Sequence, residues 1–167
     1  MNLESIFQKL QIQDMNQMQK STYTATENET DVILLSPTGS GKTLAFLFPL
    51  LRNLKKENTG IQAMILVPAR ELALQIEQVF KQMGTDFKVS ICYGGHDKKI
   101  EINNFREAPA VLIGTPGRIA YHLRNQNFDP TTIKTLVLDE FDKALELGFE
   151  EDMNIIIKKL KNCSQRT

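Results

Sequence analysis

The sequence has little of three features that would assign it to particular protein classes: cysteine, net charge and long hydrophobic runs. Its two cysteines, Cys92 and Cys163, lie far apart in the chain and fit no metal-ligand spacing, so we expect free, reduced thiols. The 20 basic and 20 acidic residues cancel, so any contact with RNA or DNA must come from a local patch. Because no secretory signal pattern and no apolar run of membrane-spanning length is present, we expect a cytoplasmic protein without a membrane partner.

The length of 167 residues suits one α/β domain that buries a real core. Short apolar runs alternate with helical patterns along the chain, and most of these runs are uninterrupted. An uninterrupted apolar run is typical of a strand buried on both faces of a parallel sheet. We therefore predict an α/β fold with a mostly parallel central sheet, whose strands cover residues 32–35, 63–67, 89–93, 110–114 and 135–138.

The helices are predicted from apolar residues at helical spacing. The polar, glutamine-rich residues 1–30 suggest two short helices that cap the core. A helical pattern follows each expected strand, and the last pattern carries Phe149, Met153 and Leu160 on its inward face. Ligands of such sheets bind at the carboxyl ends of the strands, so the functional residues are expected at that edge.

One stretch, Asp31–Thr43, combines strand, turn and helix in a form that suits phosphate binding. Residues 36–41 cannot continue the apolar strand before them, and a helical pattern begins at Lys42. Gly39 and Gly41 let the backbone adopt positive φ and gather several N–H groups around one point, a concavity that holds phosphate. The alternative is a glycine-rich turn that binds nothing.

The start of the following helix adds charge and a metal ligand. Lys42 brings a full charge that reaches the β- and γ-phosphates of a nucleotide, and the Thr43 hydroxyl is placed to bind Mg²⁺. Ser36 holds the place of the first glycine in the pattern G-x-x-x-x-G-K-[ST]. The predicted nucleotide-binding residues of this stretch are Ser36, Thr38, Gly39, Ser40, Gly41, Lys42 and Thr43.

Two adjacent acids, Asp139 and Glu140, directly follow the last expected strand. They therefore belong to the same edge of the sheet as residues 36–41, called the phosphate turn below. Two neighbouring carboxylates repel each other there unless a cation or a reaction uses them. We expect Asp139 to hold Mg²⁺, and Glu140 to orient or deprotonate the water that attacks the γ-phosphate. The alternative is a pair of acids that only favour a helix start.

These segments together resemble the motifs of the DEAD-box RNA helicases in order and spacing. The resemblance begins near Gln19 and covers the first of the family's two RecA-like domains. It implies a three-layer RecA-like P-loop NTPase domain over residues 31–167, preceded by a cap over residues 1–30. The motif-like segments are Ser36–Thr43, Pro68–Ala73, Gly94-Gly95, Thr115–Arg118 and Asp139–Asp142, where Phe141 replaces the alanine of Asp-Glu-Ala-Asp.

The resemblance also implies roles for residues outside the phosphate turn. Gln19 takes the place of the glutamine that reads the adenine edge of ATP, and Asp142 that of a residue that couples the two domains. The implied RNA-binding residues, which would grip the backbone of a single strand, are Pro68, Arg70, Gly94, Gly95, Thr115, Gly117 and Arg118. Each has a plainer alternative: a surface glutamine, a turn, a helix cap, or an arginine that pairs with a nearby acid.

The segment that resembles the family ends at Gln165–Thr167, about where family members begin the strand leading to motif III. Family members use a second domain with arginine fingers, so this part alone is expected to be inactive or very weak. The missing strand would lie between the strands of the phosphate turn and of the two acids. Unpaired backbone groups are costly, so a dimer formed by strand exchange is one expected outcome.

The leading hypothesis is the ATP- and RNA-binding half of an ATPase that separates short RNA duplexes. Two other readings stay open. One is a DNA translocase of the same wider superfamily. The other is a non-catalytic, nucleotide-dependent RNA-binding module, which the unusual Phe141 makes thinkable.

Overall fold

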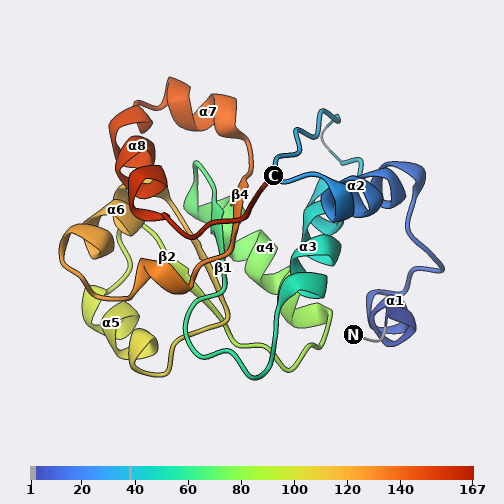
Figure 1. The fold of residues 1–167 in the computed structure, drawn as a ribbon, viewed down its shortest axis with the longest axis horizontal. Coiled ribbons are helices and arrows are strands. Elements are labelled where there is room, and N and C mark those ends of the chain that lie inside the picture. Colours follow the sequence, from blue (N-terminus) through green and yellow to red (C-terminus); the bar gives the residue numbers. More distant parts are fainter. Residues whose placement is uncertain (1–2, 38) are drawn as a thin grey trace.

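Five short parallel strands run through the centre of the molecule, with helices on both faces (Figure 1). This computed structural model describes residues 3–37 and 39–167. The sheet order is β2-β3-β1-β4-β5, and each neighbouring pair is parallel. The α/β fold with a parallel sheet, predicted from the sequence, is confirmed. The strands are β1 (Ala63–Leu66), β2 (Val89–Cys92), β3 (Val111–Gly114), β4 (Thr135–Leu138) and β5 (Gln165–Arg166).

The helices begin where the sequence supplies a suitable first residue. Gly41, with φ at 90°, leads directly into α3, and Pro116 stands in the first turn of α6, where a missing N–H costs nothing. The helices are α1 (Leu3–Leu10), α2 (Gln17–Asn28), α3 (Lys42–Asn53), α4 (Arg70–Gln82), α5 (Lys98–Arg106), α6 (Pro116–Arg124), α7 (Phe141–Glu146) and α8 (Glu150–Lys159), with a short 3₁₀ turn at Pro130–Thr132.

Alternate residues of each strand enter two separate cores. Ala63 and Ile65 of β1 pack in the core that also contains α3 and α4, with the amino-terminal helix α1 against it. Met64 and Leu66 point to the opposite face, which α5, α6 and α8 cover (Figure 1). All four side chains are at least 98% buried, which explains why the strand reads as an uninterrupted apolar run.

The predicted strand over residues 32–35 is wrong. The segment is extended but pairs with the sheet only at its start, where Asp31 bridges to Arg166 and Val32 N–H donates to Arg166 O at 2.9 Å. β5, which would be its neighbour, is two residues long. Ile33 and Leu35 are therefore 88% and 89% exposed, although their sequence is that of a buried strand.

The strand expected to be missing beside β4 has begun as β5, which pairs with β4 and bridges to Asp31, although its two polar residues make no hydrophobic pattern. Its Gln165 is nevertheless buried and joins three elements. The side-chain Nε2 donates to Thr26 O at 2.7 Å, and Oε1 accepts from Asn53 Nδ2 at 2.7 Å. These bonds fix α2 and α3 beside the sheet at the point where β5 meets the residues before the phosphate turn.

The last predicted helix is two helices in the structure, α7 and α8. Gly148, with φ at 83°, separates them, because a left-handed residue ends a helix. Cys92 and Cys163 are both free thiols, as expected. Within the described residues, no helix is long and apolar enough to cross a membrane.

Candidate functional site

A cavity of about 560 Å³ lies at the carboxyl edge of the sheet, between the phosphate turn and the end of β4. Its polar lining comes from both predicted clusters: Ser36 and Lys42 on one side, Asp139 and Glu140 on the other. Two segments far apart in the sequence thus meet at one cavity, as the sequence predicts. The remaining lining residues are mainly apolar and include Val32, Ile33, Leu34, Leu35, Phe46, Val137, Leu138 and Phe141.

The phosphate turn is held together by hydrogen bonds between its own residues. Gly39 and Gly41 adopt φ of 81° and 90°, the left-handed conformation for which glycine was expected at both positions. The Ser40 hydroxyl donates to Pro37 O at 2.8 Å and makes a short contact with the Ser36 hydroxyl. Thr38, also predicted to bind phosphate, lies outside the described residues. Lys42 and Thr43 form the first turn of α3, directly after this loop.

Gln19 contacts the phosphate turn through the start of α2. The Asn16 side chain caps that helix by accepting from Gln19 N–H, and Gln19 Oε1 accepts from Asn16 N–H in return. Gln19 Nε2 donates to Gly41 O at 3.2 Å, and Asn16 Nδ2 donates to Ser40 O at 3.0 Å. Gln19 is therefore buried beside the nucleotide cavity, with its amide engaged by the protein. Its adenine-reading role stays a prediction.

The two acids sit in an unusual electrostatic and backbone environment. Burial raises the pKa of the Asp139 carboxyl, and the neighbouring Glu140 raises it further, while Lys42 opposes both effects. Glu140 has φ at 49°, a conformation that side chains other than glycine rarely adopt, and its carboxylate pairs with Lys143 at 2.8 Å. Strain of this kind collects at functional sites. A bound cation would favour the charged form of Asp139.

Phe141 and Asp142 line the outer part of the same cavity. Phe141 is 44% exposed although it lines the cavity, so it is not part of the buried core. Asp142 is exposed on α7, where it is free to meet another part of the protein. Both positions agree with an edge that is completed by an additional segment.

The predicted RNA-binding residues follow β1, β2 and β3 at the same edge of the sheet. Arg70 is exposed at the start of α4, where its Nε donates to Glu71 Oε1 at 2.7 Å, while Pro68 before it is buried. Gly94 and Gly95 are exposed, and a Cβ added at either would meet no atom within 4 Å. The turn that they form is thus open to a ligand.

The start of α6 lies beside this glycine turn. Thr115 is its buried N-cap residue, and its N–H donates to Cys92 O at 3.0 Å, which joins the ends of β2 and β3. A Cβ on Gly117 would lie 3.3 Å from Asp152 of α8, so this glycine permits a close approach. The Arg118 side chain is only 9% exposed and points inward to Glu101 at 3.0 Å.

Sequence reasoning missed the residues that hold Arg118. They are Glu101 and His122, both fully buried, and the half-buried His96. The available signal was the helical spacing of Glu101 and Phe105, which places an acid on the same inward face as an aromatic ring. A charged residue at such a position is rarely buried without partners.

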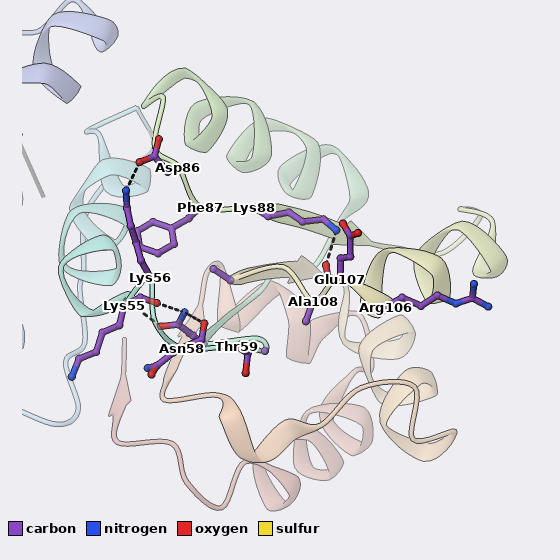
Figure 2. A pocket seen from close by; sticks show the side chains of 13 residues that line it. Lys55, Lys56, Asn58, Thr59, Asp86, Phe87, Lys88, Arg106, Glu107 and Ala108 are labelled. Atoms are coloured by element: carbon purple, nitrogen blue, oxygen red, sulfur yellow. Dashed lines mark hydrogen bonds and ion pairs between the residues drawn. The ribbon is translucent and has the colours of Figure 1, made fainter.

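A second cavity, of about 590 Å³, lies at the opposite, amino-terminal edge of the sheet (Figure 2). Residues just before the strands line it, including Gln62, Lys88 and Ala110. Two of its three lysines are already engaged: Lys88 Nζ donates to Glu107 O at 2.6 Å, and Lys56 pairs with Asp86. Because ligands of parallel sheets bind at the carboxyl edge, this cavity is not the candidate nucleotide site.

Comparison with known proteins agrees with the geometry. Residues 16–167 match the DEAD/DEAH box helicase family. The chain is 40% identical over 150 residues to the ATP-dependent RNA helicase CshA of Limosilactobacillus reuteri, covering 89% of this chain and 30% of that protein. It is 36% identical over 151 residues to the ATP-dependent rRNA helicase RRP3 of Encephalitozoon cuniculi, covering 89% of this chain and 38% of that protein.

Solved structures show the same arrangement. A DEAD box protein from Methanococcus jannaschii superposes with a TM-score of 0.89 at 29% identity, covering 98% of this chain and 45% of that one. The chain spans less than two fifths of the length of the two curated relatives above. The fold is that of a RecA-like domain, and the resemblance predicted from the motifs is confirmed. The chain belongs to the DEAD/DEAH box helicase family.

Proposed function

We propose that this chain is the ATP-binding and RNA-binding first domain of an RNA helicase, which couples ATP hydrolysis to local separation of RNA strands. The observation that carries this proposal is the single cavity shared by Lys42 and the acids Asp139 and Glu140. The two curated relatives are an ATP-dependent RNA helicase and an ATP-dependent rRNA helicase, which supports ATP as the nucleotide and RNA as the polymer.

In this proposal the phosphates of ATP lie against the turn. The backbone N–H groups of Ser36 and of residues 38–41, together with the Lys42 ammonium group, bind them. Thr43 and Asp139 offer hydroxyl and carboxylate oxygens, the donors that Mg²⁺ prefers, so these residues fit that ion. Bound Mg²⁺ would neutralise phosphate charge. Glu140 orients or deprotonates the attacking water, and Gln19 reads the adenine edge next to the turn that it already contacts.

RNA is proposed to lie along the ends of β1, β2 and β3. The contacts would come from the exposed Arg70, Gly94 and Gly95 and from the less exposed Pro68, Thr115 and Gly117 beside them, with Arg118 behind. These residues offer N–H groups and charge to phosphates, so they would grip the backbone without reading sequence. Residues 1–30 form the cap of the nucleotide site and residues 31–167 the RecA-like domain proper. Because its thiols are free, the cytoplasm is a suitable compartment for this protein.

A second RecA-like domain is the proposed partner for hydrolysis. Asp142, exposed beside the cavity, is positioned to meet it and to couple RNA binding to turnover. The unpaired edge of residues 33–35 suits an additional β-strand, because Ile33 and Leu35 expose an apolar face there. A second copy of this chain could supply that strand. A mass that stays monomeric at all protein concentrations would exclude this dimer.

The proposed function is tested by binding and by turnover. We expect the chain to bind Mg·ATP and Mg·ADP better than the guanine nucleotides, and single-stranded RNA better than DNA of the same sequence. With a second RecA-like domain present, ATP hydrolysis should rise when RNA is added. Equal stimulation by DNA would favour a DNA translocase. Nucleotide-dependent RNA binding without turnover would indicate a non-catalytic binding module.

A further inference from the structure

A buried acid joins the two loops at which RNA is proposed to bind. Glu101, in α5, is fully buried. Its Oε1 accepts from Tyr93 N–H at 3.2 Å and lies 3.0 Å from His96 Nδ1. Its Oε2 accepts from Arg118 Nη1 at 3.0 Å and lies 2.7 Å from His122 Nε2. One carboxylate thus contacts the end of β2, the glycine turn and two positions of α6.

The partners of Glu101 also hold each other. Arg118 Nη2 donates to His96 O at 3.0 Å, a direct bond between α6 and the residue after the glycine turn. The second ring nitrogen of His122 lies 2.8 Å from Asn127 Nδ2, and Phe105 packs edge-on against the same ring, with centroids 5.1 Å apart. Every group in this network is therefore held from more than one side.

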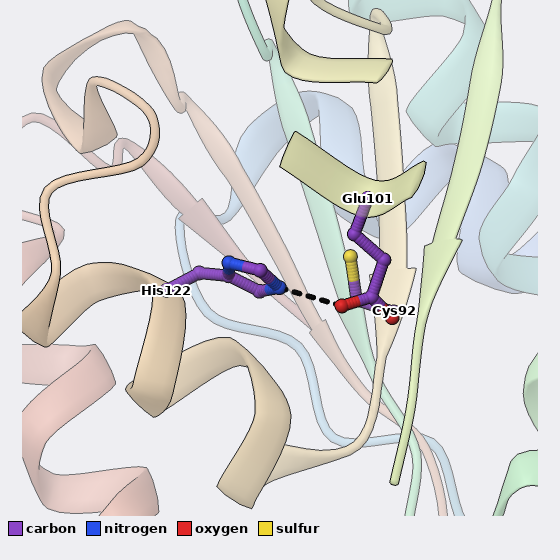
Figure 3. A group of neighbouring side chains, drawn as sticks. All are labelled: Cys92, Glu101 and His122. Atoms are coloured by element: carbon purple, nitrogen blue, oxygen red, sulfur yellow. Dashed lines mark hydrogen bonds and ion pairs between the residues drawn. The ribbon is translucent and has the colours of Figure 1, made fainter. Parts of the chain in front are cut away.

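The same place offers three ligand atoms of the kind that bind metal ions. The ligand atoms of Cys92, Glu101 and His122 lie within 4.8 Å of one another (Figure 3). The Arg118 guanidinium already lies against the Glu101 carboxylate, so a metal ion there would face a fixed positive charge. Burial also raises the pKa of the Cys92 thiol, which opposes the thiolate that a metal needs. The geometry is that of a hydrogen-bonded ion pair.

A buried carboxylate of this kind is stable only while its partners remain in place. Burial raises its pKa, but the bonds from His122 and His96 and the charge of Arg118 outweigh burial, so the pKa of Glu101 is lowered overall. The carboxylate is therefore charged at neutral pH and fixes the positions of its donors. Those donors are His96, which follows the Gly94-Gly95 turn, and Arg118 and His122 of α6, beside the exposed glycines at the carboxyl edge.

We propose that Glu101 is a positioning residue that fixes the Gly94-Gly95 turn against the start of α6, so that both form one phosphate-binding surface for RNA. Arg118 acts in the same way: its guanidinium joins Glu101 to His96 O. The proposal rests on the proposed RNA binding of these loops. It adds the cause of their relative position, which is the contact of Glu101 in α5 with Arg118 and His122 in α6 behind the two loops.

Three variants of the chain separate hydrogen bonding from charge and from volume. Glu101→Leu keeps the volume but removes all four contacts. Glu101→Gln removes the charge and about one of the four contacts. The amide has one acceptor oxygen and one donor NH₂ group, and a histidine ring that faces the NH₂ group can accept from it by changing tautomer. Glu107→Gln is the matched control, since it changes the net charge equally at an exposed residue just past the end of α5.

The first readout is the dissociation constant for a single-stranded RNA oligonucleotide, measured beside that for Mg·ADP. We expect Glu101→Leu to weaken RNA binding by about tenfold or more, and Glu101→Gln by no more than about threefold. Glu107→Gln should equal the wild type, and all variants should bind Mg·ADP normally. RNA affinity that is unchanged in Glu101→Leu would overturn the proposal. So would a loss in Glu107→Gln as large as in Glu101→Leu, because the change in net charge would then be the cause.

The second readout needs no RNA. The Tyr93 amide donates to Glu101, so its hydrogen exchange should accelerate about tenfold or more in Glu101→Leu and little in Glu101→Gln. His96→Ala removes one partner at the surface without touching the core, and should accelerate exchange in residues 94–97 alone. If wild-type chain fails to bind RNA, the proposed function is wrong, while exchange still decides the positioning role. Unaltered exchange in both Glu101→Leu and His96→Ala would overturn it.

Discussion

The two halves of the carboxyl edge differ in how completely their groups are paired. At the nucleotide cavity, Ile33 and Leu35 are almost fully exposed, Asp139 has a raised pKa, and Glu140 holds a strained backbone conformation. At the proposed RNA surface, Glu101 is fully buried and each of its carboxylate oxygens has two partners. The nucleotide half therefore has the features of a site completed by a ligand or strand, and the RNA half those of a preformed one.

The largest expected effect concerns turnover at the nucleotide half. Glu140→Gln should lower ATP hydrolysis by about 100- to 10,000-fold, because the proposed general base loses its charge, while Mg·ATP binding remains. Hydrolysis is measured with a second RecA-like domain and RNA present. Glu146→Gln, at an exposed acid of α7, the helix that directly follows Glu140, is the control and should keep full activity. Wild-type turnover in Glu140→Gln would assign the base to another residue.

The same substitution in two apolar segments tests the difference in packing. Leu66→Ala, in β1, should lower the free energy of unfolding by about 2–5 kcal/mol, because the side chain is 2% exposed. Leu35→Ala should lower it by less than about 0.5 kcal/mol, since the side chain is 89% exposed. Denaturant unfolding of both variants measures this difference. Equal losses would mean that residues 32–35 are covered in solution, as a strand-exchanged dimer would cover them.

Nucleotide affinity should depend on the single lysine of the phosphate turn. Lys42→Ala should weaken Mg·ADP binding by about 10- to 100-fold, because the phosphates lose a charged hydrogen bond. Titration calorimetry measures this loss, and Lys158→Ala, an exposed lysine on α8, serves as the control. An unchanged affinity in Lys42→Ala would refute the phosphate-binding role of the turn.

The smallest expected effect is the pH dependence of stability at the RNA half. A carboxyl group whose pKa is lowered by folding stabilises the protein above its unfolded pKa, near 4.3 for a glutamate, and this stability is lost as the pH falls through the folded pKa. Below about pH 4.3 the wild type should therefore lose stability more steeply than Glu101→Gln. The free energy of unfolding at several pH values measures this. Parallel curves would show that Glu101 is not held in its charged form.

Much of the fold could be predicted because the strands β1, β3 and β4 are apolar on both faces and their helices are amphipathic. Residues 32–35 carry the same pattern, yet they are not a strand. Hydrophobic pattern reports which residues suit burial, whereas a strand also needs a neighbour for its backbone groups. β5 is the opposite case: its sequence has no strand pattern, yet it is a strand. Its position depends on the bonds of Gln165 to α2 and α3.

In the candidate site, too, some features could be predicted from the sequence and others could not. The convergence of Lys42 and Asp139 on one cavity was predicted from the carboxyl ends of two parallel strands, and it holds although only Asp139 directly follows a strand, β4, while residues 32–35 are extended without being one. The inward position of Arg118 did not follow, because it depends on Glu101, which lies on a different helix and faces the interior. A motif places a residue at an edge of the sheet, but its neighbours decide which way the side chain points.

The central claim is that the phosphate turn and the two acids bind one magnesium nucleotide. It is tested most directly by following backbone amide resonances while Mg·ADP is added. The account predicts that residues 39–43 and residues 139–140 shift together, with a single dissociation constant, and that Lys42→Ala weakens both responses equally. Shifts confined to one of the two segments, or two different dissociation constants, would contradict it.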